Sequence, residues 1–169
     1  MCLNWFKSTT SSNLKLLNSK IKKIILSKPI QESGEKLGFL PGEIKDKIDP
    51  FMESYRSNLV KLLHDPNVVG WLEATGVIEF RPLAYMRGRT FTNAIVIADE
   101  MQNATKEQMK MLLTRIGHGS RIIVTGDLAQ HDRGFAENGL KDFVEKIKEI
   151  DPEYVSSVSF TRQDVERHP

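Results

Sequence analysis

The order of apolar and polar residues along the chain alternates between two patterns, one typical of buried strands and the other of amphipathic helices. Short runs that are apolar at every position, such as residues 95–98, are typical of strands covered on both faces in a parallel sheet. Longer segments with apolar residues three and four positions apart predict helices with one buried face. Strands are predicted at 23–27, 77–80, 95–98, 121–125 and 154–160, and helices at 11–21, 51–63, 68–74, 105–116 and 137–149.

This succession of strands and helices predicts an α/β fold with a mostly parallel sheet flanked by helices. The helix ahead of the fourth strand has a clear start, because Thr105 and Gln108 have the spacing of a capping box. Residues 30–50 and 82–90 are predicted as loops, the first because it is rich in glycine, proline and charge. No internal repeat or linker interrupts the pattern, so a single domain over 1–169 is expected.

Two adjacent carboxylates, Asp99 and Glu100, come directly after the apolar run at 95–98. The carboxyl ends of parallel strands are where open α/β sheets bind ligands. An acidic pair at such a position is the Walker B arrangement, in which the first acid holds Mg²⁺ and the second orients the water that attacks the γ-phosphate of ATP. Acid pairs also follow apolar runs by chance, so the interpretation needs a second element.

The strand at 121–125 provides that second element. It leads into Gly126, Asp127 and Gln130, which form a Gly-Asp-x-x-Gln sequence similar to a phosphate-sensing pattern of superfamily 1 helicases. In that pattern the aspartate holds the metal or the attacking water, and the glutamine contacts the γ-phosphate. Two elements of this kind at the ends of successive strands predict a site for ATP and Mg²⁺.

Beyond these motifs, several segments resemble the PhoH family of RecA-like ATPases, which are related to superfamily 1 helicases. The similar segments lie at 23–29, 34–42, 82–90, 99–103, 108–111, 114–115, 125–127 and 164–169. The resemblance runs from about residue 20 to the end, which leaves residues 1–20 divergent or truncated. It implies a RecA-like P-loop NTPase core, ATP hydrolysis coupled to work on RNA such as unwinding, and assembly into homo-oligomeric rings.

The resemblance also implies roles for individual side chains. Asp99 would anchor Mg²⁺, with Asp127 beside it, and Glu100 would be the base that orients the attacking water. Gln130 would report the γ-phosphate. The residues expected to act on the nucleotide or its metal are Asp99, Glu100, Gln102, Gly126, Asp127 and Gln130.

Three arginines and a tyrosine are further candidates. Arg87 and Arg89 flank a glycine in the loop before the acidic strand, and with Tyr85 they could contact an RNA backbone and stack a base. The plainer alternative is a solvated turn whose arginines pair with acids. Arg167 could supply positive charge to a γ-phosphate in the same or a neighbouring subunit, or could simply lie in an exposed terminus.

One expected motif is absent. Residues 1–169 contain no Gly-x-x-x-x-Gly-Lys-Ser/Thr sequence, whose backbone amides and lysine cradle the phosphates of ATP. Lys7 and Ser8 follow Trp5 and Phe6, whose bulk would block close approach of the backbone to a phosphate. The chain is therefore expected to begin after the phosphate loop or to have lost it, as a truncated or split gene product or a degenerate protein. Independent turnover is expected to be weak, since each missing charge-assisted bond is worth roughly 1.5–3 kcal/mol.

Composition indicates the cellular compartment of the protein more than its function. The formal net charge of +2 on 169 residues carries no general nucleic-acid signature, so any RNA-binding surface must be local. The single cysteine, Cys2, suits a reducing compartment. No apolar run reaches membrane-spanning length and no signal peptide is evident, which favours a cytoplasmic protein without membrane contact.

Two other classes of function remain open. The chain could be a non-catalytic remnant or subunit that docks on RNA or on a complementary chain carrying the phosphate loop. It could also be a metal nuclease that uses the acidic pair. Nucleases usually assemble three or four acids, however, and Gly126–Gln130 fits an ATPase sensor better than a nuclease site.

Overall fold

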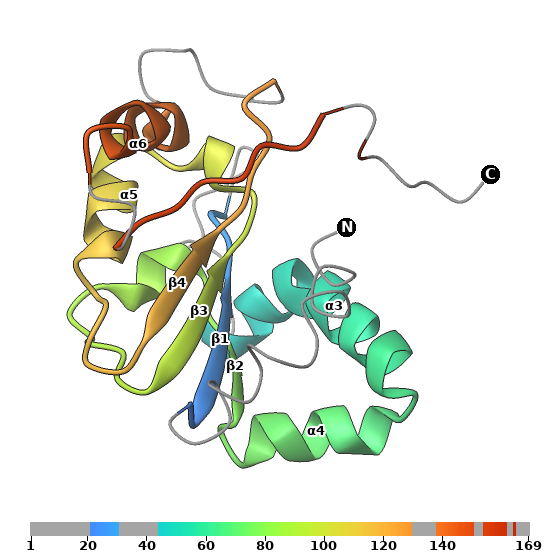
Figure 1. Ribbon diagram of the computed structural model, residues 1–169. Coiled ribbons are helices and arrows are strands. Elements are labelled where there is room, and N and C mark those ends of the chain that lie inside the picture. Colours follow the sequence, from blue (N-terminus) through green and yellow to red (C-terminus); the bar gives the residue numbers. More distant parts are fainter. Residues whose placement is uncertain (1–20, 31–43, 130–137, 151–153, 162–163, 165–169) are drawn as a thin grey trace.

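The computed structural model describes residues 21–30, 44–129, 138–150, 154–161 and 164 (Figure 1). Within these residues one sheet of four strands is formed, in the order β2-β1-β3-β4, and every neighbouring pair is parallel. The strands are β1 (Lys23–Ser27), β2 (Ile78–Phe80), β3 (Ala94–Ala98) and β4 (Arg121–Val124).

Helices cover both faces of this sheet (Figure 1). One face carries the two helices that connect β1 to β2, and the other carries the segments that follow β2, β3 and β4. The first layer consists of α3 (Ile44–Leu63) and α4 (Pro66–Ala74), and the second of the 3-10 turns η2 (Leu83–Met86) and η3 (Met101–Asn103) with α5 (Lys106–Leu113) and α6 (Gly139–Ile147).

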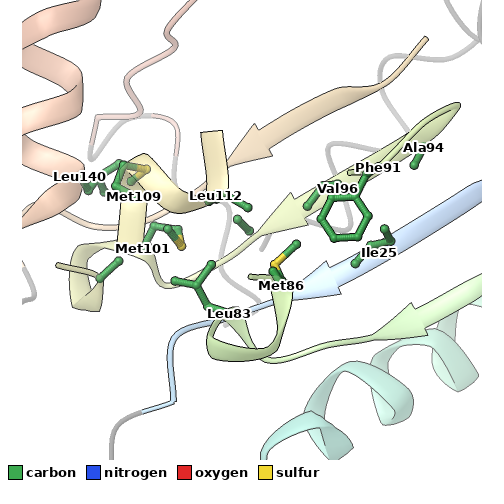
Figure 2. Close-up of a cluster of buried hydrophobic side chains, with 12 residues drawn as sticks. Ile25, Leu83, Met86, Phe91, Ala94, Val96, Met101, Met109, Leu112 and Leu140 are labelled. Carbon is green, nitrogen blue, oxygen red and sulfur yellow. The ribbon is translucent and has the colours of Figure 1, made fainter. Parts of the chain in front are cut away.

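The main hydrophobic core lies between the sheet and the second layer (Figure 2). Side chains alternate between the two faces of a strand, so the core takes Val96 and Ala98 from β3 and Ile25 from β1. By the same alternation, Ile97 and the residue after β3, Asp99, face the α3 layer. The buried members of this core are Ile25, Leu83, Met86, Phe91, Ala94, Val96, Ala98, Met101, Ala104, Met109, Leu112 and Leu140.

The predicted α/β fold with a parallel sheet flanked by helices is confirmed, and the arrangement is consistent with a RecA-like core. Strand β1 has the predicted bounds, 23–27. The capping box is formed in full, because Gln108 N donates to Thr105 Oγ1 and Thr105 N donates to Gln108 Oε1. The predicted helix at 11–21 lies almost entirely outside the described residues.

Several predicted element bounds differ from the structure. Helix α3 begins at Ile44 and contains Pro50, so residues 44–50 of the predicted loop are helical, while 31–43 lie outside the described residues. The predicted loop at 82–90 contains the η2 turn. Helix α5 ends at Leu113, and the residues after it pair with the segment ahead of β3, where Phe91 N donates to the carbonyl of Arg115.

The largest correction concerns the last predicted strand, at 154–160. These residues form no strand, and the segment pairs with no member of the sheet. Tyr154, Val158 and Phe160 are 79%, 73% and 69% exposed. Their alternating pattern therefore reflected no buried face in this part of the chain.

Among the described residues, no helix combines the length and the apolar character needed to cross a lipid bilayer.

Candidate functional site

Polar side chains gather where β3 and β4 end, because these neighbouring strands are parallel and paired in register. Ala98 lies opposite Val124, which places Asp99 and Thr125 at matching positions just beyond the strands. The hydrogen-bond ladder continues past the last paired residues: Asp99 N donates to Ser27 O over 2.8 Å, and Thr125 N donates to Ala98 O over 2.8 Å. The backbone beneath Asp99 is therefore fixed on both sides.

The carboxylate of Asp99 accepts hydrogen bonds from two hydroxyl groups on different elements. Thr125, just after β4, donates its hydroxyl to Oδ1. Tyr55, from helix α3, donates its phenolic hydroxyl to Oδ2 over 3.2 Å. Donors on both oxygens define the plane of the carboxylate, which is a property that a metal-binding acid requires.

Glu100 has an unusual backbone. Its φ and ψ of 55° and 33° lie in the left-handed region, which costs an L-residue about 1–2 kcal/mol. Conformations of this kind concentrate at functional sites, because the surrounding structure must enforce them. Backbone hydrogen bonds on either side hold the turn, since Asp99 N donates to Ser27 O over 2.8 Å and Met101 N donates to Thr125 O over 3.0 Å. The side-chain amide of Gln102 donates to Glu100 Oε2 over 2.6 Å. The carboxylate of Glu100 is thereby directed while the residue itself remains exposed.

Gln102 also connects this turn to the loop after β4. Its side chain is 3% exposed, and its Oε1 accepts a hydrogen bond from Asp127 N over 3.2 Å. Gly126 lies against it, since a Cβ on this glycine would stand 2.7 Å from Gln102 Oε1 and 2.6 Å from Leu140 Cδ2. Gln102 and Gly126, both expected to act on the nucleotide, therefore brace the loops that carry the acids.

Asp127 lies at the same edge of the sheet as Asp99, one strand further along. Its Oδ1 accepts a hydrogen bond from Ala129 N over 2.8 Å, an Asx turn that shapes the loop. No cluster of three or more acidic, histidine or cysteine side chains able to hold a metal occurs in the described ranges. A cation beside Asp99 would therefore complete its coordination with water or phosphate oxygens, as Mg²⁺ does at nucleotide sites.

The remaining predicted residues lie elsewhere. Gln130 and Arg167 lie outside the described residues. Tyr85 belongs to η2, and Arg87 and Arg89 follow it, so this loop is on the layer opposite α3. All three side chains are exposed, and the Arg89 guanidinium is 6.0 Å from the Phe91 ring centroid.

The alternative in which Arg87 and Arg89 pair with acids is not seen in the part of the chain that the structure describes. The ion pairs found there involve other residues, among them Arg56 with Glu73 and Lys23 with Glu79. The two arginines are therefore available to an outside anion.

Sequence reasoning missed the two hydroxyl donors to Asp99. Thr125 could have been found, because alternation along β4 puts it on the same face as Asp99. Tyr55 lies in the helix predicted at 51–63, and nothing local shows that this helix reaches the end of β3. Lys28, directly after β1, was also missed as part of the site; its ammonium is 5.3 Å from the centre of the Tyr55 ring.

Comparison with known proteins shows which family this chain is similar to. The sequence profile described as PhoH-like protein matches residues 9–169. The chain is 46% identical over 154 residues to a PhoH-like protein of Mycobacterium tuberculosis, covering 90% of this chain and 43% of that protein. It is 47% identical over 156 residues to one of Bacillus subtilis, covering 91% and 48%. Protein PhoH of Escherichia coli is 42% identical over 155 residues, covering 90% and 43%. The chain thus spans less than half the length of these relatives.

Proposed function

Because this chain belongs to the PhoH-like family, we propose that it binds ATP with Mg²⁺ at the carboxyl edge of β3 and β4 and couples this binding to the handling of RNA. The observation that carries the proposal is the Asp99 carboxylate, oriented by two hydroxyl groups at the carboxyl edge of a parallel sheet. Glu100 is the next residue in the chain, and Asp127 follows the neighbouring strand β4. This edge is where open α/β sheets bind ligands.

The side chains fit a magnesium–phosphate complex. Mg²⁺ is commonly held by one or two carboxylates, with waters and phosphate oxygens completing its shell, and Asp99 and Asp127 offer those carboxylates. When bound, the ion would neutralise charge on the β- and γ-phosphates. Glu100, directed by Gln102, would accept a hydrogen bond from the attacking water and orient it. Gln130 would contact the γ-phosphate, and Arg167 would add positive charge there.

A complete site also needs a phosphate loop. Residues 1–169 contain no Gly-x-x-x-x-Gly-Lys-Ser/Thr sequence. We therefore propose that the phosphate contacts come from another segment or from a complementary chain that carries the loop, including one that assembles with this chain in a ring. By itself the chain would bind Mg·ATP weakly, because several charge-assisted hydrogen bonds of roughly 1.5–3 kcal/mol each are missing.

RNA would be bound away from the acids, at the loop between η2 and β3. The exposed Arg87 and Arg89 would contact phosphates of a single strand, and Tyr85 would offer a face for a base. Binding there should weaken as salt rises, because each neutralised phosphate releases counterions.

The proposal is tested with the chain alone and with a version to which a phosphate loop has been restored. Fluorescent ATP binding and ATPase turnover are measured for both, with and without single-stranded RNA. We expect Mg²⁺-dependent binding in both and turnover only with the loop, raised by RNA. Asp99→Asn in the same background should remove the Mg²⁺ dependence. Zero binding and zero turnover in both versions would contradict the ATPase function.

A second candidate, a non-catalytic subunit that binds RNA or a complete ATPase, is favoured by the lack of a phosphate loop in residues 1–169 together with the exposed Arg87 and Arg89. In that case RNA binding would be lost in Arg87→Ala/Arg89→Ala and would be indifferent to both Asp99→Asn and added Mg·ATP.

A further inference from the structure

Helix α3 contacts the acidic edge of the sheet through the side chain of Tyr55. The hydroxyl of Tyr55 is 3.2 Å from Asp99 Oδ2, and the two residues are 44 positions apart in the chain. This bond joins the connection between β1 and β2 to the end of β3. A helix that belongs to neither acidic loop thereby takes part in orienting the first acid.

The position of Tyr55 is determined independently of Asp99. Met52, one turn earlier on α3, is 0% exposed and anchors the helix. Arg56, the next residue, donates to both carboxylate oxygens of Glu73 on α4, over 2.9 and 2.8 Å. Its guanidinium also lies 5.1 Å from the centre of the Phe80 ring at the end of β2. The phenol is therefore presented to Asp99 by a helix that is already fixed to α4 and the sheet.

The ring of Tyr55 has a second partner at the same edge. The ammonium of Lys28, which follows β1, is 5.3 Å from the ring centre, a cation–π distance. Residues that follow β1, β3 and β4 (Lys28, Asp99 and Thr125) are thus connected through one tyrosine and one carboxylate. Rotation of the Asp99 carboxylate would break a bond to α3, to the end of β4, or to both.

We propose that Tyr55 is a positioning residue for the cation at Asp99: its hydroxyl holds the carboxylate in the orientation that binds the ion, and cation binding in turn stabilises the end of α3 at the site. This inference rests on the proposed function. Hydrogen bonds to metal-binding carboxylates orient them, and losing such a partner commonly lowers metal affinity by roughly tenfold or more. Because coupling between two equilibria is reciprocal, α3 must respond to the ion if the ion depends on α3.

The test uses Tyr55→Phe, which removes only the hydroxyl and keeps the ring that Lys28 contacts. The matched control is Tyr154→Phe, at a tyrosine that is 79% exposed. Mn²⁺ is the probe, with its affinity for each full-length variant measured by electron paramagnetic resonance, alone and with ATP. Asp99→Asn identifies the signal that belongs to Asp99, and urea unfolding shows whether each variant retains its stability.

We expect Tyr55→Phe to weaken Mn²⁺ binding at Asp99 by roughly tenfold, and Tyr154→Phe to leave it unchanged. Amide hydrogen exchange in α3 should slow on addition of Mg²⁺ in the wild type and not in Tyr55→Phe. A purely structural role would lower the urea midpoint without changing the metal affinity of the folded protein, and that result overturns the inference.

The two proposals fail in different ways. Mn²⁺ binding at Asp99 that is indifferent to Tyr55→Phe overturns the positioning role alone. Mn²⁺ binding that depends on Tyr55, with no effect of ATP on it, upholds the positioning role and contradicts the nucleotide function. Absence of any Mn²⁺ signal that depends on Asp99 overturns both.

Discussion

Asp99 and Glu100 are adjacent in the chain but are held in different ways. Asp99 depends on distant residues: the donors to its carboxylate lie 44 positions earlier and 26 positions later. The carboxylate of Glu100 instead has a partner within its own turn, where Gln102, two positions later, donates a hydrogen bond to it. A metal-binding acid gains from rigid support by several elements, whereas a water-orienting acid needs a turn that places one side chain. A substitution that removes a hydrogen-bond partner of one acid should therefore leave the function of the other acid intact.

The largest difference between the two acids is expected when each is substituted directly. Asp99→Asn removes the charge at the metal position and should lower the affinity for Mg·ATP by roughly tenfold to a hundredfold, since bonds to a charged group are worth about 1.5–3 kcal/mol. Glu100→Gln keeps a group of the same shape and should leave that affinity nearly unchanged while turnover is lost. Titration with a fluorescent ATP analogue and a turnover assay, both in the version with a phosphate loop, measure the two effects. Equal losses of binding in the two variants would show that the acids act as one unit.

The next effect concerns the loop after β4, which braces the Glu100 turn. Gly126→Ala would place a methyl group 2.7 Å from Gln102 Oε1 and 2.6 Å from Leu140 Cδ2. Overpacking of this kind costs about 1–3 kcal/mol, so the free energy of unfolding should fall by that amount in urea titrations. Gly70→Ala, in α4, has nothing within 4 Å of the added atom and should be neutral or stabilising. If Gly126→Ala proved as stable as the wild type, the close approach to Gln102 would not be a constraint.

The contrast between the two acids also shows which features of the site could be predicted from the sequence. The place of Asp99 and Glu100 at a sheet edge followed from an unbroken apolar run, because such runs form buried parallel strands. Glu100's bond to Gln102 is local. The bond from Tyr55 required knowing that α3 crosses the face of the sheet on which Asp99 lies, and no local pattern contains that information.

The errors in secondary structure have the same physical origin. Residues 44–50 contain a proline and many charges, yet they continue α3, so tertiary context outweighed local propensity. Residues 154–160 alternate like a strand, but no strand of the described sheet pairs with them. Strand formation needs a partner as well as a pattern, and the pattern alone is visible in the sequence.

Tyr55→Phe is expected to weaken metal binding, whereas substitution of Gln102 should lower turnover and leave the Mg²⁺ requirement unchanged. Gln102→Met keeps the length of the buried side chain and removes both its bond to Glu100 and its bond from Asp127 N. We expect turnover to fall roughly tenfold, the size of the effect commonly seen when an orienting partner is lost, with little change in the Mg²⁺ concentration needed for half-saturation. Steady-state assays over a range of Mg²⁺ concentrations separate the two quantities. A raised Mg²⁺ requirement without loss of turnover would contradict the assignment of metal binding to Asp99 and water orientation to Glu100.

The smallest effect concerns a carboxylate held by charges instead of hydroxyl groups. Burial alone would raise the pKa of Glu79, but hydrogen bonds and charge from Lys23 and Arg81 more than offset this, and the pKa is lowered. A group with a lowered folded-state pKa stabilises the protein above its unfolded-state pKa of about 4.3, and that contribution disappears as the pH falls through the folded-state value. Glu79→Gln should therefore unfold more easily than the wild type at neutral pH, by less than about 1 kcal/mol for a pair this close to solvent.

In strong acid the difference between Glu79→Gln and the wild type should disappear, because the wild-type carboxyl group is then protonated as well. Urea unfolding across the acid range measures this, with Glu149→Gln, at an exposed residue just after α6, as the control. A difference that stays constant down to the lowest pH would mean that Glu79 contributes through packing and not through its charge. Since Glu79 lies on β2 and not at the carboxyl edge, neither outcome should change the Mg²⁺ requirement. A changed Mg²⁺ requirement in Glu79→Gln would show that Glu79 also supports the acids.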